Sequence, residues 1–390
     1  MKNINKSKTT PELTPDETLR YSRHLLIPEI GLGGQQRLKG STVLVIGTGG
    51  LGSPVSMYLA AAGVGRIGLV DYDRVEFSNL QRQVVHGSAA LNQLKVESAR
   101  ARLLDINPDI EVVAYNEVFT SQNAMRIAKG YDVLVDGTDN FPTRYLSNDV
   151  CVMLGIPNVY GAIYRFDGQA SVFDTRSGGP CYRCVFPTPP PPGMTPTCAE
   201  GGVLGVLPGT IGTIQATEAI KLLLGIGSTL SGRLLMYNAL DLTFDTVNLR
   251  RNPNCVVCGD QPSITELIDY DEFCGLPGHA DEVDDEYDIT ASELAGRLEN
   301  GERLRLIDVR EPHERQIANI PGSESIPLGD LAGQLSELDS AEEIVLYCRT
   351  ESRALRALEL LLGAGFRRVA VLEGGVNAWA RDVDPKQAQY

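Results

Sequence analysis

Cys348 lies where a thiol could carry out chemistry, between a short apolar segment and a longer amphipathic one. The segment before it, EIVLY, predicts a strand, and the segment after it, SRALRALELLLGAGF, predicts a helix. Amide groups and the dipole at the start of a helix stabilise a thiolate, or a persulfide formed on that sulfur. The alternative is a buried structural cysteine at the end of a strand. The predicted loop consists of Cys348, Arg349, Thr350, Glu351, Ser352 and Arg353.

A second candidate site is a glycine-rich turn with the spacing G-x-G-x-x-G, formed by Gly47, Gly49 and Gly52. It follows the apolar segment VLVIG, and together with Gly50 it lets the backbone approach a phosphate at the start of a helix. Asp71 ends the next predicted strand, 19 residues after Gly52, where its carboxylate can accept hydrogen bonds from a ribose. The pattern predicts a nucleotide site. The alternative is a tight structural turn.

Further polar residues follow the same predicted strands and indicate which nucleotide is bound. Asn79 and Arg82 stand in SNLQRQ, Lys95 follows in LNQLKVESAR, and Asp139 and Asn140 follow DVLVDG. Cations offset the charge of a triphosphate, and a carboxylate binds Mg²⁺, so this set predicts ATP chemistry. In the alternative, a nicotinamide-dependent oxidoreductase, Arg82, Lys95 and Asp139 would have no use.

Two CxxC pairs offer four sulfur atoms in the first part of the chain. Each pair lies among glycines and prolines, which allow the thiolates to converge, and four thiolates suit tetrahedral Zn²⁺ at ~2.3 Å. The alternative for a single pair is a redox dithiol. Two pairs in one predicted domain favour a zinc ion that supports folding and not catalysis. The predicted ligands are Cys181, Cys184, Cys255 and Cys258.

Cys198 follows a proline-rich stretch, PTPPPPGMTP, which predicts an exposed and extended loop. A cysteine there could act as a covalent thiol or pack as a small hydrophobic side chain. Cys151 and Cys274 belong to no motif, and we expect no chemical role for them. The polar N-terminus shows no secretory signal, so the eight cysteines indicate metal or thiol chemistry in a cytoplasmic protein.

The composition excludes several classes of partner. The hydrophobic fraction of 43% and the charged fraction of 22% are those of an ordinary soluble protein. A formal net charge of −15 repels phosphate backbones and anionic lipids, so we expect no nucleic-acid or membrane partner. The longest apolar runs are far shorter than the ~18 residues that a membrane span needs.

The pattern of elements predicts an α/β fold in two domains. Strands alternate with helices from VLVIG onward, which is typical of a parallel sheet with both faces covered. A second α/β pattern begins after the acidic run DEVDDEYD. We predict a flexible N-terminus (1–18), a large Rossmann-like domain (19–265), an acidic linker (266–286) and a small C-terminal domain (287–390).

Four segments of the large domain resemble one family in their order: RYSRHLLIPEIG, VLVIGTGGLGSPVSMYLAAAGVG, LVDYDRVEFSNLQRQ and DGTDN. This is the ThiF and molybdopterin-synthase adenylyltransferase (MoeB) group, which is related to ubiquitin-activating enzymes. The resemblance implies adenylation of the C-terminal glycine of a ThiS- or MoaD-like carrier, and zinc at the four cysteines. It implies an ATP and Mg²⁺ site at Gly49, Asp71, Asn79, Arg82, Lys95, Asp139 and Asn140. It also implies a homodimer in which Arg23 enters the partner's site, and a covalent role for Cys198.

The C-terminal domain resembles a rhodanese domain through LIDVRE, IPGSESIPL, YCRTESRA and LEGGVNAW. The resemblance implies that Cys348 carries sulfane sulfur. One residue departs from the pattern, because rhodanese loops commonly have glycine where this chain has Glu351. A carboxylate there disfavours an anionic donor such as thiosulfate, and a side chain strains a loop whose backbone needs a positive φ.

Together the two resemblances imply a reaction in two halves. The first domain makes an acyl-adenylate on a small carrier that ends in Gly-Gly, and the Cys348 persulfide then converts it to a thiocarboxylate. A cysteine desulfurase or thiosulfate would supply the sulfur, and molybdopterin, thiamine and cysteine biosynthesis are all compatible pathways. The alternative is a ubiquitin-type activating enzyme that works through a Cys198 thioester, with the rhodanese domain as a docking module.

Overall fold

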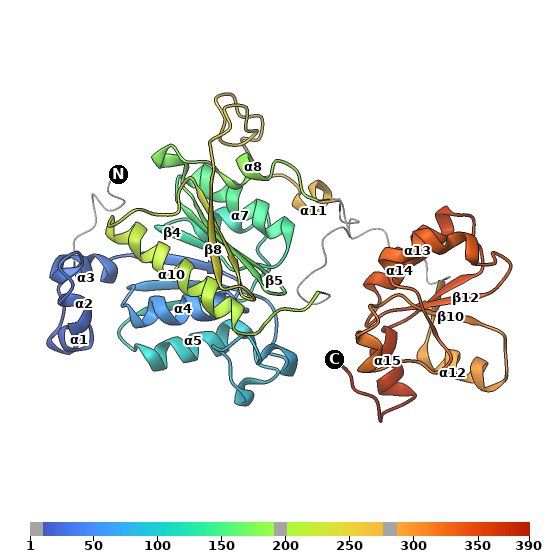
Figure 1. Cartoon of the computed structure of the whole chain (residues 1–390). Helices are drawn as coiled ribbons and strands as arrows, with labels where there is room; N and C mark the ends of the chain where they lie inside the picture. The colour runs from blue at the N-terminus through green and yellow to red at the C-terminus, as the bar shows by residue number, and fades with distance from the viewer. Residues whose placement is uncertain (1–10, 191–200, 276–286) are drawn as a thin grey trace. The chain divides into compact units, whose positions relative to one another are not determined.

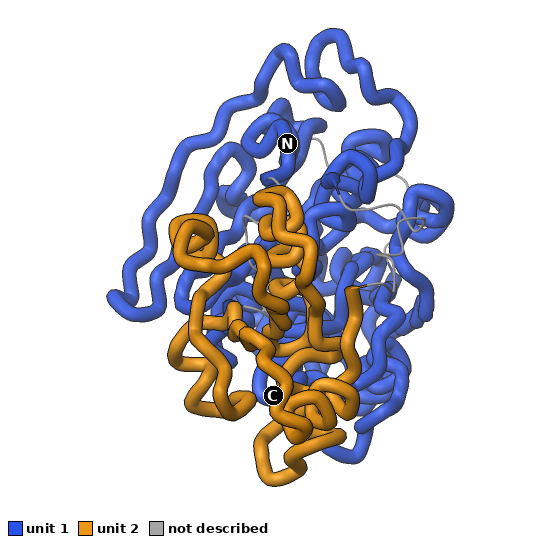
Figure 2. Tube along the Cα trace, turned by 90° about the vertical axis from the view of Figure 1, so that its right-hand side faces the viewer, with its two compact units in different colours: residues 1–278 blue, residues 279–390 orange. Residues whose placement is uncertain are grey.

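The structure is a computed structural model that describes residues 11–190, 201–275 and 287–390 (Figure 1). The chain divides into two compact units, residues 1–278 and 279–390 (Figure 2). Cys198 and most of the predicted acidic linker lie outside the described residues. Among the helices of the described residues, none has the length and apolar character that crossing a bilayer requires.

The first unit is built on an eight-stranded sheet in the order β3-β2-β1-β4-β5-β6-β7-β8. The first five of these strands pair in parallel, as the alternation of strands and helices predicts. The other three add an antiparallel extension, which the sequence analysis did not predict. The strands are β1 (Thr42–Ile46), β2 (Arg66–Val70), β3 (Glu111–Tyr115), β4 (Val133–Asp136), β5 (Asn158–Tyr164), β6 (Asp167–Phe173), β7 (Arg233–Asn238) and β8 (Thr243–Asn248).

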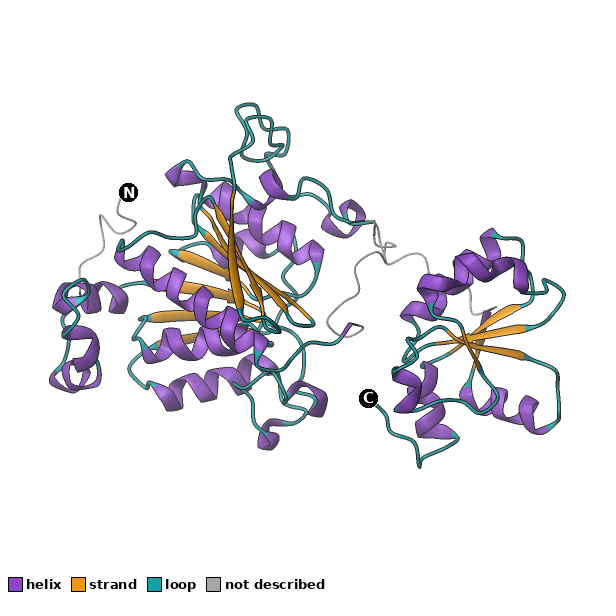
Figure 3. Cartoon of the chain, in the orientation of Figure 1, coloured by secondary structure: helices purple, strands orange, loops and turns teal. Residues whose placement is uncertain are grey.

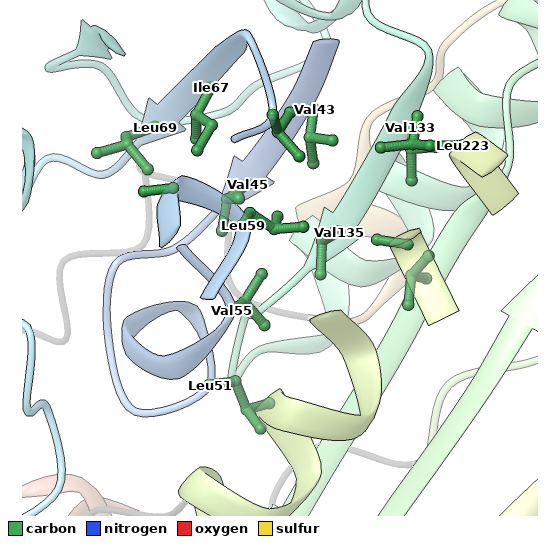
Figure 4. Packing of buried hydrophobic residues seen from close by; sticks show 14 of the residues in the cluster. Val43, Val45, Leu51, Val55, Leu59, Ile67, Leu69, Val133, Val135 and Leu223 are labelled. Atoms are coloured by element: carbon green, nitrogen blue, oxygen red, sulfur yellow. The ribbon is translucent and has the colours of Figure 1, made fainter. Parts of the chain in front are cut away.

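Helices cover both faces of this sheet (Figure 3). Val43 and Val45 of β1 pack with residues of α4 and α10 on one face, shown in Figure 4, and Leu44 and Ile46 pack in a second cluster on the other. Successive side chains of a strand point to opposite faces, so burial on both explains why β1 is continuously apolar. The first face carries α4 (Gly52–Ala61), α5 (Lys95–Ile106) and α10 (Leu207–Leu224), and the second carries α6 (Ala124–Ala128), α7 (Phe141–Leu154), α8 (Tyr182–Val185) and α11 (Tyr270–Phe273).

Helical structure begins earlier than the predicted flexible N-terminus allows. The first helices are α1 (Pro15–Arg20), α2 (Ser22–Leu25) and α3 (Gly31–Lys39). A capping box starts α1, because the amide of Glu17 donates to Thr14 Oγ1 at 3.2 Å and the amide of Thr14 donates to Glu17 Oε2 at 2.7 Å. Lys39 then pairs with Glu17 at 2.7 Å and ties α1 to α3.

The start of the predicted linker packs against the first unit. Tyr270 of α11 is buried, and Leu267 and Ile268 pack against the cluster that contains α7. The Tyr270 hydroxyl donates to Asp149 Oδ2 at 2.9 Å, and the same carboxylate binds Arg183 at 2.8 Å. The apolar residues of TELIDYDEFCG therefore extend the ordered first unit beyond residue 265.

The second unit has a five-stranded, all-parallel sheet in the order β11-β10-β12-β13-β9. Val345 and Tyr347 of the central strand face one helical layer, and Ile344 and Leu346 face the other. The strands are β9 (Asp288–Ile289), β10 (Arg305–Asp308), β11 (Glu324–Ser325), β12 (Ile344–Tyr347) and β13 (Val369–Leu372). One layer consists of α12 (Ala291–Glu299) and α15 (Gly375–Asp382), and the other of α13 (Leu328–Gln334) and α14 (Ser352–Gly363).

Candidate active sites

The glycine-rich turn follows β1, which lies between β2 and β4 at the point where the strand order reverses. Ligands of open α/β sheets bind outside the strand ends at such a point. Gly47 has a φ of +85°, and a Cβ there would lie 2.9 Å from the carbonyl oxygen of Gly137. A Cβ on Gly52 would lie 1.9 Å from the Gly47 oxygen. Packing therefore requires both glycines, whereas Gly49 has only the Gln83 side chain nearby, at 3.6 Å, and leaves room for a ligand.

Asp71 is held against this turn. Its Oδ2 accepts hydrogen bonds from the amide of Thr48 at 2.8 Å and from the Thr48 hydroxyl at 2.9 Å. Its Oδ1 accepts from the amide of Asp73 at 3.0 Å. The carboxylate thus fixes the shape of the glycine turn and stands at its edge, where the sequence predicts a ribose contact.

Lys95 and the acidic residues of two strand ends come together beside the turn. Lys95 begins α5, its side chain is 7% exposed, and its Nζ lies 2.7 Å from Asp73 Oδ2. Burial raises the pKa of the Tyr72 hydroxyl, and three nearby carboxylates raise it further: Asp73, Asp71 and Asp139. The structure therefore brings Asp139, which follows β4, into the electrostatic neighbourhood of the acids that follow β2. The sequence analysis missed Asp73, although its place two residues after Asp71 was a usable signal.

Asn79 and Arg82 lie on the segment that follows these acids. Asn79 is buried, and its Oδ1 accepts a hydrogen bond from the amide of Glu76 at 3.3 Å. This contact orders the turn before Arg82. A Cβ on Gly50 would lie 3.9 Å from Arg82 Cγ, so the arginine stem stands directly beside the glycine turn.

A buried carboxylate that the sequence analysis missed supports the opposite side of the turn. Asp136 ends β4, is fully buried, and accepts hydrogen bonds at Oδ1 from the amide (3.0 Å) and hydroxyl (2.6 Å) of Thr138. Its Oδ2 has no hydrogen-bond partner among the described residues and lies 3.8 Å from Arg144 Nε. Burial raises the pKa of Asp136, although the Arg144 charge opposes that shift. Asp136 thereby shapes the turn that carries Asp139.

Asp139 and Asn140 play different parts in the structure. Asp139 is exposed at the strand end, where it is free to meet a ligand or metal ion. Asn140 is the N-cap of α7, because its Oδ1 accepts from the amide of Thr143 at 2.9 Å. The Asn140 side chain therefore stabilises the start of α7 beside the candidate site.

Arg23 is exposed on α2 and lies at the opposite end of α4 from the glycine turn. Its neighbour His24 contacts Gln35 at 3.0 Å, and Gln35 Nε2 donates to the carbonyl of Ala62 at 2.8 Å. Ala62 follows the last residue of α4, whose first residue is Gly52. A ten-residue helix is about 15 Å long, so α2 is anchored well away from the nucleotide turn of its own chain.

The four predicted zinc ligands converge. Neighbouring Sγ atoms lie 3.8, 3.5 and 3.3 Å apart, and all four lie within 4.8 Å of one another. Tetrahedral zinc with bonds of ~2.3 Å separates its sulfur ligands by roughly 3.8 Å, so the cluster fits the ion. Hydrogen bonds among the four thiols lower the pKa of Cys184 and Cys255 and raise the pKa of Cys181 and Cys258, because the close sulfur atoms share their protons. The cluster consists of Cys181, Cys184, Cys255 and Cys258.

Cys348 follows β12, and its side chain is 1% exposed within the apolar core of the second unit. Its loop is seated on the start of α15, because the amide of Val376 donates to the Cys348 carbonyl at 2.9 Å. Gly375 has a φ of +57°, and a Cβ there would lie 2.3 Å from the Thr350 oxygen. Two helix N-termini, those of α14 and α15, therefore meet at the thiol-bearing loop.

The loop side chains differ from what the sequence alone predicts. Glu351 has a φ of −147°, so the strain of a positive φ does not arise. Its Oε1 accepts a hydrogen bond from the amide of Gly374, which directs its charge toward the start of α15. Arg353 forms two hydrogen bonds with Glu314, at 2.6 and 2.7 Å. The guanidinium of Arg353, one of the two arginines in the loop, is thus already paired with a carboxylate.

Comparison with known proteins supports this division of the chain. Residues 21–257 match the ThiF family, and residues 290–382 match the rhodanese-like domain. Both resemblances predicted from the motifs are confirmed, as is the two-part α/β fold.

Several curated proteins are similar over much of the chain. The probable adenylyltransferase/sulfurtransferase MoeZ of Mycobacterium tuberculosis (strain CDC 1551 / Oshkosh) is 48% identical over 97% of this chain and 96% of its own length. The adenylyltransferase and sulfurtransferase MOCS3 of Drosophila yakuba is 43% identical over 97% of this chain and 86% of its own. A sulfur carrier protein adenylyltransferase of Thermus thermophilus is 54% identical over 67% of this chain and 98% of its own.

Solved structures show the same fold at greater distance. The Escherichia coli MccB structure with ATP is 22% identical, has a TM-score of 0.54, and covers 62% of this chain and 75% of MccB. At this identity the likeness concerns the fold alone. From the match over residues 21–257 and the identities above, we conclude that the chain belongs to the ThiF family and carries a rhodanese-like domain behind its ThiF domain.

Proposed function

We propose that this protein adenylates the C-terminal glycine of a ubiquitin-like sulfur carrier and converts the product to a thiocarboxylate with sulfur carried on Cys348. The observation that carries the proposal is the presence of two complementary sites in one chain. One is a glycine turn flanked by Lys95 and acidic strand ends, and the other is a strand-to-helix loop that bears a thiol. MoeZ and MOCS3 carry both transferase names, and the Thermus thermophilus relative carries the adenylyltransferase name.

In the first half-reaction the carboxylate of the carrier attacks the α-phosphorus of ATP, and pyrophosphate leaves. Lys95 and Arg82 stabilise the charge that develops on the phosphates, and Lys95 exchanges its contact with Asp73 for a phosphate oxygen. Asp139 and the neighbouring acids would hold Mg²⁺, which neutralises phosphate charge when bound. The ribose would contact Asp71, whose carboxylate borders the glycine turn.

The position of Arg23 supports a homodimer in which each site receives an arginine from the other chain. Arg23 is anchored about a helix length from its own glycine turn. The helices around it expose large apolar side chains that a second copy would cover, with exposed fractions of 76% for Leu19, 73% for Leu26 and 56% for Leu32. In this arrangement Arg23 would add a third cation to the partner's phosphates.

Mixing two inactive variants tests this arrangement. Arg23→Ala and Lys95→Ala chains should each lose nearly all carrier-dependent ATP–pyrophosphate exchange. After mixing and subunit exchange, heterodimers contain one intact site, so activity should recover to about a quarter of the wild-type value. Failure of the mixture to recover, with heterodimers present by native mass spectrometry, would exclude a shared site.

In the second half-reaction the terminal sulfur of a Cys348 persulfide attacks the acyl carbon of the adenylate, and AMP leaves. The product is an acyl disulfide between the carrier and Cys348. A second thiolate then attacks the Cys348 sulfur, which releases the carrier thiocarboxylate and leaves a disulfide that cellular thiols reduce. Cys198 is our candidate for that thiol, and it lies outside the described residues.

The central experiment separates the two half-reactions. Cys348→Ala should keep carrier-dependent ATP–pyrophosphate exchange within about twofold of wild type, because Cys348 belongs to the second unit. The same variant should form no thiocarboxylate, measured by mass spectrometry of a candidate carrier ending in Gly-Gly. Thiocarboxylate formation by the variant, or a stable carrier thioester on Cys198 in the wild type, would refute the proposed route.

The side chains of the loop favour a protein persulfide as the sulfur donor. Glu351 places a carboxylate within the loop, and Arg353 is already paired with Glu314. The Glu351 carboxylate would repel a dianion such as thiosulfate, and one of the two loop arginines is already paired and does not offset that repulsion. A donor that brings its own binding surface, such as a cysteine desulfurase, would not depend on the loop for affinity.

Replacement of Glu351 tests this account of the donor. We expect Glu351→Gly to raise kcat/KM with thiosulfate several-fold, since removing the carboxylate removes repulsion of the anion. Glu359→Gly, which removes a carboxylate elsewhere on α14, serves as the control for net charge. The assay is thiocyanate release with cyanide as acceptor, and an unchanged or lower rate in Glu351→Gly would count against the account.

We assign a folding role to zinc at the cysteine cluster. The two CxxC pairs come from distant parts of the chain, and the guanidinium of Arg251 donates to the carbonyl of Cys258 at 2.6 Å to close the second pair. The cluster lies at α8, and no nucleotide-site residue named above contributes a sulfur to it. Zinc there would pin the end of the ThiF domain to its middle.

Replacing one of the four cysteines should therefore remove the zinc ion and lower the stability of the first unit. Cys255→Ser should purify without its zinc ion and unfold about 10 °C lower in the first unit, since ~3 kcal/mol shifts a domain of this size by that amount. Cys274→Ser, a buried cysteine outside the cluster, should keep its zinc. Elemental analysis and calorimetry measure both, and a wild-type protein without zinc would contradict the assignment.

A further inference from the structure

Tyr390 connects three elements around the Cys348 loop. Its hydroxyl accepts a hydrogen bond from Arg310 Nη1 at 2.6 Å and donates to Glu314 Oε1 at 3.2 Å. Its backbone is fixed by Asn377, whose side chain accepts from the Tyr390 amide at 3.1 Å and donates to the Tyr390 carbonyl at 2.9 Å. Residues 384–390 thus fold back from α15 to the loop.

These contacts reach both ends of the loop. At its far end, Glu314 holds Arg353 through two hydrogen bonds of 2.6 and 2.7 Å. At its near end, the Arg349 guanidinium lies 6.0 Å from the centre of the Tyr390 ring. The amide of Asn377, which fixes the Tyr390 backbone, donates to the Arg349 carbonyl at 3.2 Å. One tyrosine is therefore linked to the second and the last residue of the loop.

The network is shielded from water, so its geometry is well defined. The side chains of Arg353 and Glu314 are 12% and 9% exposed. Burial by itself would raise the pKa of Glu314, but the hydrogen bonds and charge of Arg353 lower it below its usual value. Arg310 is fully buried and paired with Asp308 at 2.6 Å, which gives the Tyr390 hydroxyl a rigid donor. Charge-assisted hydrogen bonds in such surroundings are strong and directional.

We propose that Glu314 and Tyr390 form a clamp that positions the loop 348–353 around the sulfur carried by Cys348. Neither residue touches the sulfur, and both act through Arg349 and Arg353 as positioning residues. Sulfur acceptance requires the loop amides to stay arranged about a developing negative charge, and arrangement in advance lowers the cost of each transfer. The inference rests on the proposed role of Cys348.

The first test compares two substitutions in the same segment of the full chain. Tyr390→Phe removes the hydroxyl and keeps the ring, whereas Gln387→Ala removes the hydrogen bond to the Asn319 amide at 2.7 Å and touches neither Arg349 nor Arg353. The probe is glutathione persulfide, whose sulfane sulfur passes to the Cys348 thiolate as the glutathione thiolate leaves. We expect Tyr390→Phe to gain sulfur on Cys348 about fivefold more slowly, and Gln387→Ala to load at the wild-type rate.

Two further readouts separate positioning from general destabilisation. Glu314→Gln should also slow loading, and the double variant should be no slower than the worse single one, because both remove the same link. The loss in Tyr390→Phe should fall on the maximal rate of loading at saturating glutathione persulfide, while the persulfide concentration that gives half of that rate stays within about twofold of wild type, since the clamp positions the loop and does not bind the donor. Trp379, the single tryptophan, lies buried in this unit, so its fluorescence reports whether each variant is folded.

The outcomes distinguish the clamp from the function on which it rests. If the wild-type chain gains sulfur on Cys348 and both Tyr390→Phe and Glu314→Gln gain it at the same rate, the clamp alone would be overturned. Equal losses in Gln387→Ala and Tyr390→Phe would also overturn it, because the effect would then belong to the whole segment. A wild-type chain that gains no sulfur on Cys348 would overturn the clamp together with the proposed function, while ATP–pyrophosphate exchange still reports on the first unit.

Discussion

Both candidate sites depend on one constraint, which is that a buried parallel strand must end in a turn that opens a helix. At the end of β1 the glycine turn leads into α4, and at the end of β12 the Cys348 loop leads into α14. In each case the unpaired amides of the helix start face the strand end and favour negative charge. Residues that follow neighbouring strands lie beside these turns: Asp71 and Asp139 in the first unit, and the backbone of Gly375 beside the thiol loop in the second. In the proposed function the two units would thus use the same backbone chemistry for a phosphate and for a sulfur anion.

A buried ion pair supports the cysteine cluster. Arg183, which lies between the first two cysteines of the cluster, is 1% exposed and pairs with Asp149 of α7 at 2.8 Å. Tyr270 of α11 donates to the same carboxylate, so one charge links the cysteine cluster, a core helix and the end of the first unit. Removing a single partner of such a pair leaves an uncompensated buried charge, which typically costs 3–5 kcal/mol. The position of the cysteine cluster is therefore fixed by the packed core around it as well as by the contacts among the four sulfur atoms.

The sequence predicted the parts of each site that depend on local pattern. Gly47, Gly52 and Asp71 occupy positions that a strand, turn and helix impose. The spacing of the two CxxC pairs was enough to predict the cysteine cluster. Glu314, Arg353 and Tyr390 lie far apart in sequence and left no local signal, whereas Asp136 and Arg144 are close in sequence but match no motif that we recognised. Helix α1 was a different kind of omission, because Thr14 and Glu17 form a capping box that could have been recognised.

The pairing of Lys95 with Asp73 has a consequence for how a nucleotide enters. A buried lysine without a counter-ion would draw inorganic phosphate or other small anions into the glycine turn. Here a carboxylate of the same chain occupies that cation at 2.7 Å, and the carboxylate itself is 48% exposed. In the proposed function, an incoming triphosphate would therefore displace the Asp73 carboxylate, which would turn into water and stay close to Lys95. After the reaction the same aspartate could pair with the lysine again, which would favour release of the products.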